Sequence, residues 1–150
     1  MDKGEKMIDG VIIEPLKQIA DARGKVLHMI RSDSKNFTKF GEIYFSSVNS
    51  RSVKAWRKHK LMTQHFAVPM GEILLVLYDD REKSSTKGEI QEVHLGGDNY
   101  NLVRIPPLVW YGFKGISIMP ALIANCTDIP HDPSETEKLE FNDLRIPYQW

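Results

Sequence analysis

The residues best suited to chemistry lie in one polar stretch, residues 54–65, which reads KAWRKHKLMTQH. If this stretch forms a strand, side-chain alternation puts Lys54 and Trp56 on one face. Arg57 and His59 then share the other face and point together into a pocket. A guanidinium beside an imidazole suits an anionic or carbonyl-bearing substrate. The alternative is a solvated basic loop, and the pattern alone does not separate the two.

No metal site or standard nucleophile is expected. A histidine-based metal site in a small β-barrel needs an HxH pair with a carboxylate and a later histidine, but Arg57 holds the first position and cannot ligate. His94 and His131 lie far away near turns, where surface or structural roles are expected. Cys126 ends an apolar run, as a buried inert thiol would. The sequence contains no GxSxG, P-loop or GxGxxG motif.

A second informative stretch is RIPPLVWYGF, residues 104–113. A diproline followed by bulky side chains predicts a rigid corner lined with aromatic rings. Such corners in all-β proteins usually pack in the core. They can also form a wall on which a planar base or sugar ring stacks, and that makes Trp110 and Tyr111 candidate binding residues.

The elements that must position these residues are short β-rich runs separated by turn residues. Long amphipathic helices are missing, so parallel βαβ units are not expected. Ser134 is expected to cap one short helical turn, with Glu137 at its third position. The pattern predicts an all-β sandwich or barrel. The expected strands cover residues 11–13, 25–30, 42–48, 52–56, 66–68, 73–78, 90–95, 102–105, 109–113 and 118–125.

Length and composition set the broad class. The 150 residues are 41% hydrophobic and 27% charged, which fits one soluble globular domain, residues 1–150. Twenty basic residues balance twenty acidic ones, so a non-specific nucleic-acid or membrane-surface binder is not expected. A single cysteine, a polar N-terminus and the lack of a bilayer-length apolar run predict a cytoplasmic protein.

A set of segments in a fixed order resembles the dTDP-4-dehydrorhamnose 3,5-epimerase family, especially its shorter, divergent members. The resemblance extends from Ile8 to Trp150 and rests on the whole set, because no single motif is decisive. The segments are DARG (21–24), GEIY (41–44), VKAW (53–56), YDDR (78–81), SSTKG (84–88), IPP (105–107), GF (112–113), CTD (126–128), HDPSE (131–135) and IPYQW (146–150).

The resemblance implies a cupin-type jelly roll, a homodimer, and neither metal nor redox cofactor. It implies a nucleotide-diphospho-4-keto-6-deoxy sugar as substrate, in the biosynthesis of surface polysaccharides or deoxysugars. In the family, a histidine removes the proton beside the 4-keto group and a tyrosine returns one on the opposite face. The ketone acidifies that C–H bond, so a near-neutral base and a donor to the enolate oxygen suffice.

Several residues acquire substrate-binding roles by this resemblance. Arg23 falls on a family arginine that contacts the nucleotide diphosphate, and Lys54 falls where a second arginine lies near the phosphates. Gln64 falls on a lysine that polarises the keto oxygen. Asp143 lies near the aspartate that orients the catalytic histidine.

The two proton-transfer positions of the family hold other residues in this chain. Arg57 falls on the catalytic histidine, and Ala124 falls on or near the catalytic tyrosine. Arginine stays protonated at any reasonable pH and cannot act as a general base. The standard two-sided epimerisation is therefore not expected.

His59 keeps an enzymatic interpretation open. Related cupins that act as 3,4-ketoisomerases carry an HxHK element, and RKHK at residues 57–60 retains its second histidine and its lysine. His59 would then move a proton between adjacent carbons on one face, while Arg57 stabilises an enolate. Tyr111 and His65 are candidate proton donors. The alternatives are a non-catalytic sugar-nucleotide-binding relative and an unrelated small β-barrel.

Overall fold

The computed structural model of the chain describes residues 7–150, and its regular secondary structure consists almost entirely of strands. A short 3-10 turn, η1 (Pro133–Glu135), precedes the last strand. The strands are β1 (Ile12–Pro15), β2 (Gln18–Asp21), β3 (Gly24–Leu27), β4 (Glu42–Val48), β5 (Val53–His59), β6 (Gln64–Met70), β7 (Glu72–Tyr78), β8 (Ile90–Gly96), β9 (Asn101–Ile105), β10 (Trp110–Gly115), β11 (Ala121–Thr127) and β12 (Thr136–Lys138).

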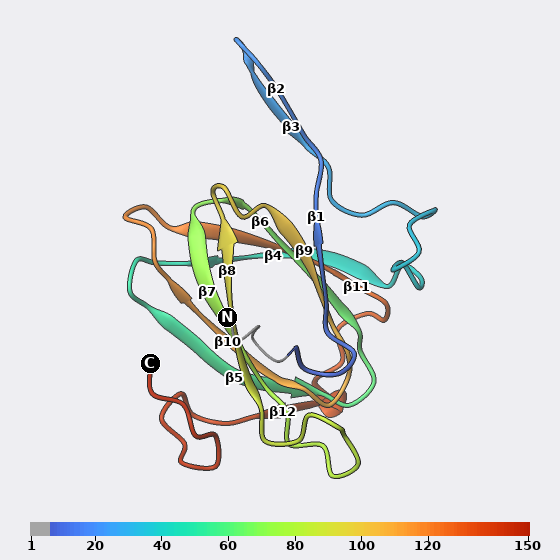
Figure 1. Cartoon of the computed structure of the whole chain (residues 1–150), viewed down its shortest axis with the longest axis vertical. Helices are drawn as coiled ribbons and strands as arrows, with labels where there is room; N and C mark the ends of the chain where they lie inside the picture. Colours follow the sequence, from blue (N-terminus) through green and yellow to red (C-terminus); the bar gives the residue numbers. More distant parts are fainter. Residues whose placement is uncertain (1–6) are drawn as a thin grey trace, which may run out of the picture.

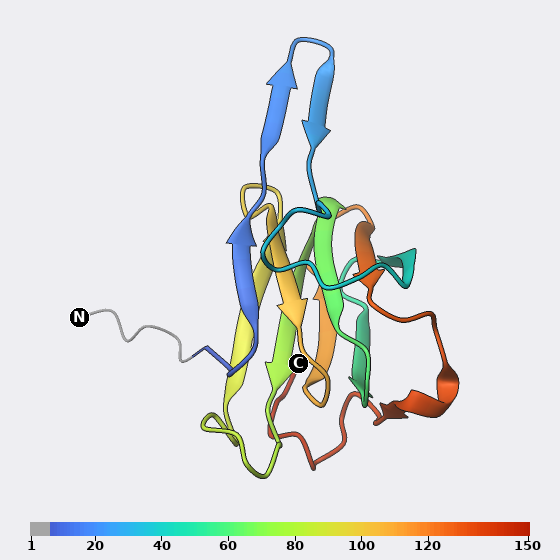
Figure 2. The same cartoon turned by 90° about the vertical axis from the view of Figure 1, so that its right-hand side faces the viewer.

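Two antiparallel five-stranded sheets form a sandwich (Figures 1 and 2). One sheet, the β4 sheet, has the order β1-β9-β6-β11-β4, and the other, the β10 sheet, has the order β12-β5-β10-β7-β8. From β4 to β7, and again from β8 to β12, each successive strand lies in the other sheet. This alternation between two sheets is that of a cupin-type jelly roll, and it confirms the predicted all-β fold class.

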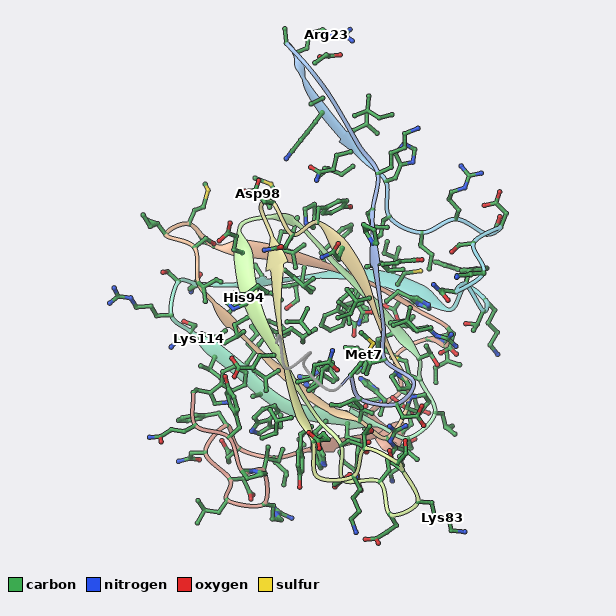
Figure 3. The ribbon with its side chains drawn as sticks, in the orientation of Figure 1. Met7, Arg23, Lys83, His94, Asp98 and Lys114 are labelled. Carbon is green, nitrogen blue, oxygen red and sulfur yellow. The ribbon has the colours of Figure 1, made fainter. Side chains whose placement is uncertain are left out.

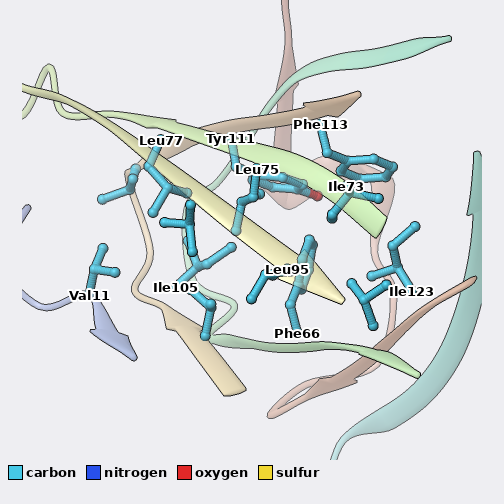
Figure 4. Close-up of a cluster of buried hydrophobic side chains, with 14 of the residues drawn as sticks. Val11, Phe66, Ile73, Leu75, Leu77, Leu95, Ile105, Tyr111, Phe113 and Ile123 are labelled. Carbon is cyan, nitrogen blue, oxygen red and sulfur yellow. The ribbon is translucent and has the colours of Figure 1, made fainter. Parts of the chain in front are cut away.

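The main core lies between the two sheets (Figure 4). The side chains of strand β7 are covered on both faces of its sheet, which explains its uninterrupted apolar sequence. Ile73, Leu75 and Leu77 face this core, while Val76 packs on the opposite side against Trp56 and other apolar side chains. Both faces of β7 are therefore covered, as the apolar run at residues 73–78 predicted.

The C-terminal segment covers the outer face of the β10 sheet. The ring of Trp56 contacts Tyr148 at 6.0 Å and Trp150 at 5.1 Å between ring centroids. The backbone of Trp56 also exchanges hydrogen bonds with Leu139, at 2.8 and 3.1 Å. These contacts hold residues 139–150 against β5, the strand that carries the polar stretch.

Strand β5 contains a bulge that changes which face its side chains occupy. Against β10, Lys54 pairs with Phe113 and Arg57 with Tyr111, so β5 has one residue more than its partner between these pairs. The expectation that Lys54 and Trp56 share a face is therefore wrong. The extra residue reverses the alternation, so Lys54 lies on the same face as Arg57 while Trp56 faces outward.

Three other local expectations need correction. Asp132, rather than Ser134, caps the 3-10 turn, and its carboxylate accepts from the Ser134 backbone N–H at 3.0 Å. Glu137 lies beyond that turn, in β12. The strand expected at residues 25–30 ends at Leu27, within a hairpin of β2 and β3 that projects from the sandwich (Figures 1 and 2).

Candidate functional site

A pocket of about 630 Å³ opens between the two sheets near β5 and the C-terminal segment. Four of its side chains are cationic and two are carboxylates, so its charge suits an anionic ligand. The lining residues are Tyr44, Ser46, Lys54, Ala55, Trp56, Arg57, Phe66, Tyr111, Phe113, Ile123, Asn125, Lys138, Leu139, Glu140, Asp143 and Arg145.

The β5 bulge brings two cations to one side of this pocket. Lys54 donates from Nζ to the hydroxyl of Ser46 on β4, at 3.1 Å, and so spans from one sheet to the other. Arg57 lines the same pocket, and within residues 7–150 its guanidinium forms no ion pair with a carboxylate. The Arg57 guanidinium is therefore free to bind an anion or a developing oxyanion.

A buried line of polar groups begins at the pocket wall with Tyr111. The Tyr111 hydroxyl lies 3.2 Å from Nε2 of His59, and the two rings stack at 5.9 Å. Nδ1 of His59 in turn contacts the carboxylate of Glu135. The exposed fractions are 6% for Tyr111, 3% for His59 and 4% for Glu135. His59 thus reaches the pocket only through Tyr111.

Glu135 is held as a carboxylate by its neighbours. Burial raises the pKa of Glu135, but hydrogen bonds from His59 and from the backbone N–H groups of Leu61 and Met62 outweigh burial and lower it overall. Because this carboxylate only accepts, Nδ1 of His59 donates to it. Nε2 of a neutral imidazole then accepts from the Tyr111 hydroxyl.

The Tyr111 phenol is kept protonated by its surroundings. Burial raises the pKa of Tyr111 strongly, while the Arg57 charge and a hydrogen bond from Gln64 oppose the shift. Gln64 also accepts from Nδ2 of Asn125 at 3.0 Å. Asn125 lines the pocket from β11 and links Gln64 to the hydroxyl of Tyr44, at 2.9 Å.

The structure brings some of the predicted residues together. One pocket is lined by Lys54, Arg57, Tyr111 and Asp143. Behind Tyr111, and in contact with it, lie His59 and Gln64. Arg57 therefore lines the pocket as predicted, but His59 does not.

Three predicted binding residues lie elsewhere. Arg23 lies at the tip of the projecting hairpin, paired with Asp21 at 2.7 Å (Figure 3). The His65 ring faces backbone carbonyls of Cys126 and Asn36, because alternation along β6 turns it away from the sandwich interior. Trp110 is on the outer face of the β10 sheet, where its indole N–H donates to Asp80 at 2.9 Å.

Asp143 lines the pocket together with Arg57, which occupies the position of the family histidine. Its carboxylate accepts two hydrogen bonds from Arg145, at 3.1 and 2.7 Å, and these hold the pKa of Asp143 down, at about 2. The carboxylate that contacts His59 is that of Glu135. The sequence contains this glutamate in the HDPSE segment, but the residues alone give no sign that it contacts His59.

Ala124, which falls on or near the position of the family tyrosine, belongs to β11. Along β11 the pocket is lined by Ile123 and Asn125, so Ala124 points to the other side of the sheet. Neither inward residue can transfer a proton as a tyrosine would. β11 therefore supplies no such group to the pocket.

Three further findings concern the described residues. Within residues 7–150 no group of three or more His, Cys, Asp or Glu side chains is arranged as metal ligands. His94 and His131 are exposed, in agreement with the surface roles expected for them. No helix in the same range has the length and hydropathy needed to span a bilayer.

Comparison with known proteins identifies the family. The family model described as dTDP-4-dehydrorhamnose 3,5-epimerase matches residues 5–150. The chain is 36% identical to the probable low-salt glycan biosynthesis epimerase Agl13 of Haloferax volcanii, covering 94% of this chain and 88% of that protein. It is 31% identical to the spore coat polysaccharide biosynthesis protein SpsL of Bacillus subtilis, covering 96% and 97%.

The crystal structure of a dTDP sugar isomerase from Desulfovibrio desulfuricans G20 is similar throughout. Its sequence is 55% identical, the match covers 95% of this chain and 92% of that one, and the TM-score is 0.93. The sequence match and the shared jelly roll point to the same family. The chain belongs to the dTDP-4-dehydrorhamnose 3,5-epimerase family.

Proposed function

We propose that this protein is an epimerase or isomerase of a nucleotide-diphospho-4-keto-6-deoxy sugar and that it moves a proton on a carbon beside the keto group. The family membership supports the reaction class. The observation that carries the proposal is the contact of 3.2 Å between the pocket-lining Tyr111 hydroxyl and His59. This contact supplies the pocket with a proton-transfer group, although Arg57 occupies the position of the family's catalytic histidine.

In this mechanism Tyr111 accepts the proton from the substrate carbon while its own phenolic proton passes to Nε2 of His59. The C–H bond breaks, an O–H bond forms on Tyr111 and an N–H bond forms on His59. The resulting imidazolium is stabilised by the Glu135 carboxylate at Nδ1. This arrangement avoids a free phenolate, which the burial of Tyr111 disfavours.

The cations of the pocket have two tasks in the proposal. Arg57, beside Tyr111 in the strand register, stabilises the enolate oxygen that forms when the proton leaves. Lys54, Lys138 and Arg145 line the same pocket and bind the diphosphate, as a cluster of cationic side chains would. The names of the Haloferax and Bacillus relatives support a role in surface-polysaccharide biosynthesis.

We further propose that the protein is a homodimer. The hairpin of β2 and β3 exposes Ile19 and Val26, at 48% and 56%, and carries Arg23 away from its own pocket. A second copy would cover these apolar side chains and bring Arg23 near a bound diphosphate. Sedimentation equilibrium is expected to give twice the chain mass of 17.2 kDa. A monomer at micromolar concentration would contradict the dimer.

Deuterium exchange tests the proposed reaction. In deuterated water, the protein is expected to introduce deuterium at C3 or C5 of dTDP-4-keto-6-deoxyglucose, which NMR detects. The non-catalytic alternative predicts that dTDP raises the melting temperature of the protein without any exchange. A protein that neither exchanges deuterium nor is stabilised by dTDP, GDP or CDP would contradict both.

Lys58→Met is the matched control for variants of the pocket cations, and it should exchange deuterium like the wild type. Lys58 pairs with Glu137 and does not line the pocket.

A further inference from the structure

The pocket wall opposite Tyr111 carries a second phenol, Tyr44. Tyr44 belongs to β4, the edge strand of the β4 sheet, whereas Tyr111 belongs to the β10 sheet. Alternation along β4 turns Ile43 and Phe45 to solvent, where they are 46% and 62% exposed. Tyr44 and Ser46 face inward and line the pocket. The two phenols thus approach one pocket from facing sheets.

The surroundings of Tyr44 suit a proton donor. Its hydroxyl oxygen accepts from Nδ2 of Asn125, its direct neighbour across the β4–β11 ladder, at 2.9 Å. The phenolic proton is therefore not used in that hydrogen bond and can be donated into the pocket. Burial raises the pKa of Tyr44, against the hydrogen bond from Asn125 and the charge of Arg57, so the phenol is protonated at neutral pH.

Tyr44 and Tyr111 also belong to one hydrogen-bonded network. Asn125 donates to both Tyr44 and Gln64, and Gln64 is hydrogen-bonded to Tyr111. The Arg57 charge acts on both phenols. The guanidinium that would stabilise an enolate is thus close enough to influence each candidate proton-transfer group.

We propose that Tyr44 donates a proton to the enolate face opposite Tyr111, and so replaces on β4 the tyrosine that β11 lacks. This inference rests on the proposed function. An enolate is planar, and one that binds parallel to the two sheets turns one face towards each of them. Tyr111 takes the proton on one face, and Tyr44 supplies one on the other. Inversion at that carbon follows.

The proton balance of this step is complete. The enolate electron pair forms the new C–H bond as the O–H bond of Tyr44 breaks. The Tyr44 phenolate regains a proton from water through the open pocket. His59 releases its extra proton through Tyr111 to water in the pocket, which balances the proton that Tyr44 takes up, and the protein returns to its starting state.

Tyr44→Phe separates the two proton transfers. The variant is incubated with dTDP-4-keto-6-deoxyglucose in deuterated water, and NMR measures deuterium in the starting sugar and in its epimer. Tyr111 can still remove a proton and return a deuteron to the same face. We therefore expect exchange into the starting sugar within about threefold of the wild-type exchange rate, while epimer formation falls by about 10²-fold or more. Tyr100→Phe is the matched control, because Tyr100 is buried outside the pocket.

Each outcome has one meaning for the proposal. Epimer formation by Tyr44→Phe within about threefold of wild type overturns the role of Tyr44 and leaves the proposed function standing. A variant that loses exchange and epimer formation together also overturns it, because Tyr44 would then be needed for proton removal or for the fold. A wild-type protein without exchange contradicts the proposed function, and this inference with it.

Discussion

Replacement of Tyr111 by phenylalanine is expected to lower kcat by about 10³- to 10⁴-fold, because no other described group connects His59 to the pocket. The ring itself should stay in place. Phe66 contacts it edge-on at 5.5 Å, and His59 stacks on it, so phenylalanine fills the same space. The lost hydroxyl removes the hydrogen bonds with His59 and Gln64, at a cost of about 1 kcal/mol of stability each. Steady-state kinetics with the 4-keto sugar nucleotide measure the effect.

The companion variant His59→Ala distinguishes a relay from direct contact. If His59 acts only through Tyr111, the two single variants lose similar activity and the double variant is little worse than either, since the residues act as one unit. Tyr111→Phe with more than a third of wild-type kcat, beside an inactive His59→Ala, would show that His59 reaches the substrate itself. Tyr100→Phe again reports the effect of removing a phenolic hydroxyl outside the pocket.

Replacement of Glu135 by alanine is expected to lower the free energy of unfolding by about 3–5 kcal/mol, because each buried donor left without an acceptor costs about 1–3 kcal/mol. The substitution leaves His59 and the backbone N–H groups of Leu61 and Met62 without their buried acceptor. Glu137→Ala, two residues away, is the matched control. The Glu137 carboxylate pairs with Lys58 at 3.1 Å but is 45% exposed, so its loss should cost no more than about 1 kcal/mol.

Urea unfolding at several pH values tests the same contact through its charge. The pKa of Glu135 is lowered from its ordinary value of 4.5, so the carboxylate stabilises the fold fully above about that pH. This stabilisation is lost as the pH falls through the lower pKa of the folded state. The stability difference between wild type and Glu135→Gln should therefore narrow in acid. A difference in unfolding free energy that does not change with pH would mean that the charge of Glu135 does not contribute to stability.

Much of the fold followed from local patterns. The apolar run at residues 73–78 predicted a strand covered on both faces, and its side chains do divide between two clusters. Short runs between turn residues predicted an all-β sandwich because each run has the length and alternation of a strand. Arg57 and Tyr111 were candidates from residue type and position, and both line the pocket. Their catalytic roles stay predictions.

Other features of the site depended on pairing between strands. Alternation assigns a face only while a strand is paired regularly, and the extra residue of β5 reverses it, so Lys54 lies on the same face as Arg57. Glu135 meets His59 across 76 residues of chain because β12 pairs with β5. No local pattern contains that pairing.

The sequence by itself therefore determined the sandwich, the family and the absence of a histidine at position 57. Residue type, order and hydrophobic alternation are enough for these conclusions, since they depend on neighbours along the chain. Only the tertiary structure decided that Glu135 supports His59, that His59 lies behind Tyr111 and that Tyr44 faces the same pocket. The physical reason is that contacts between sheets depend on strand order and register, which side-chain alternation within one strand does not specify.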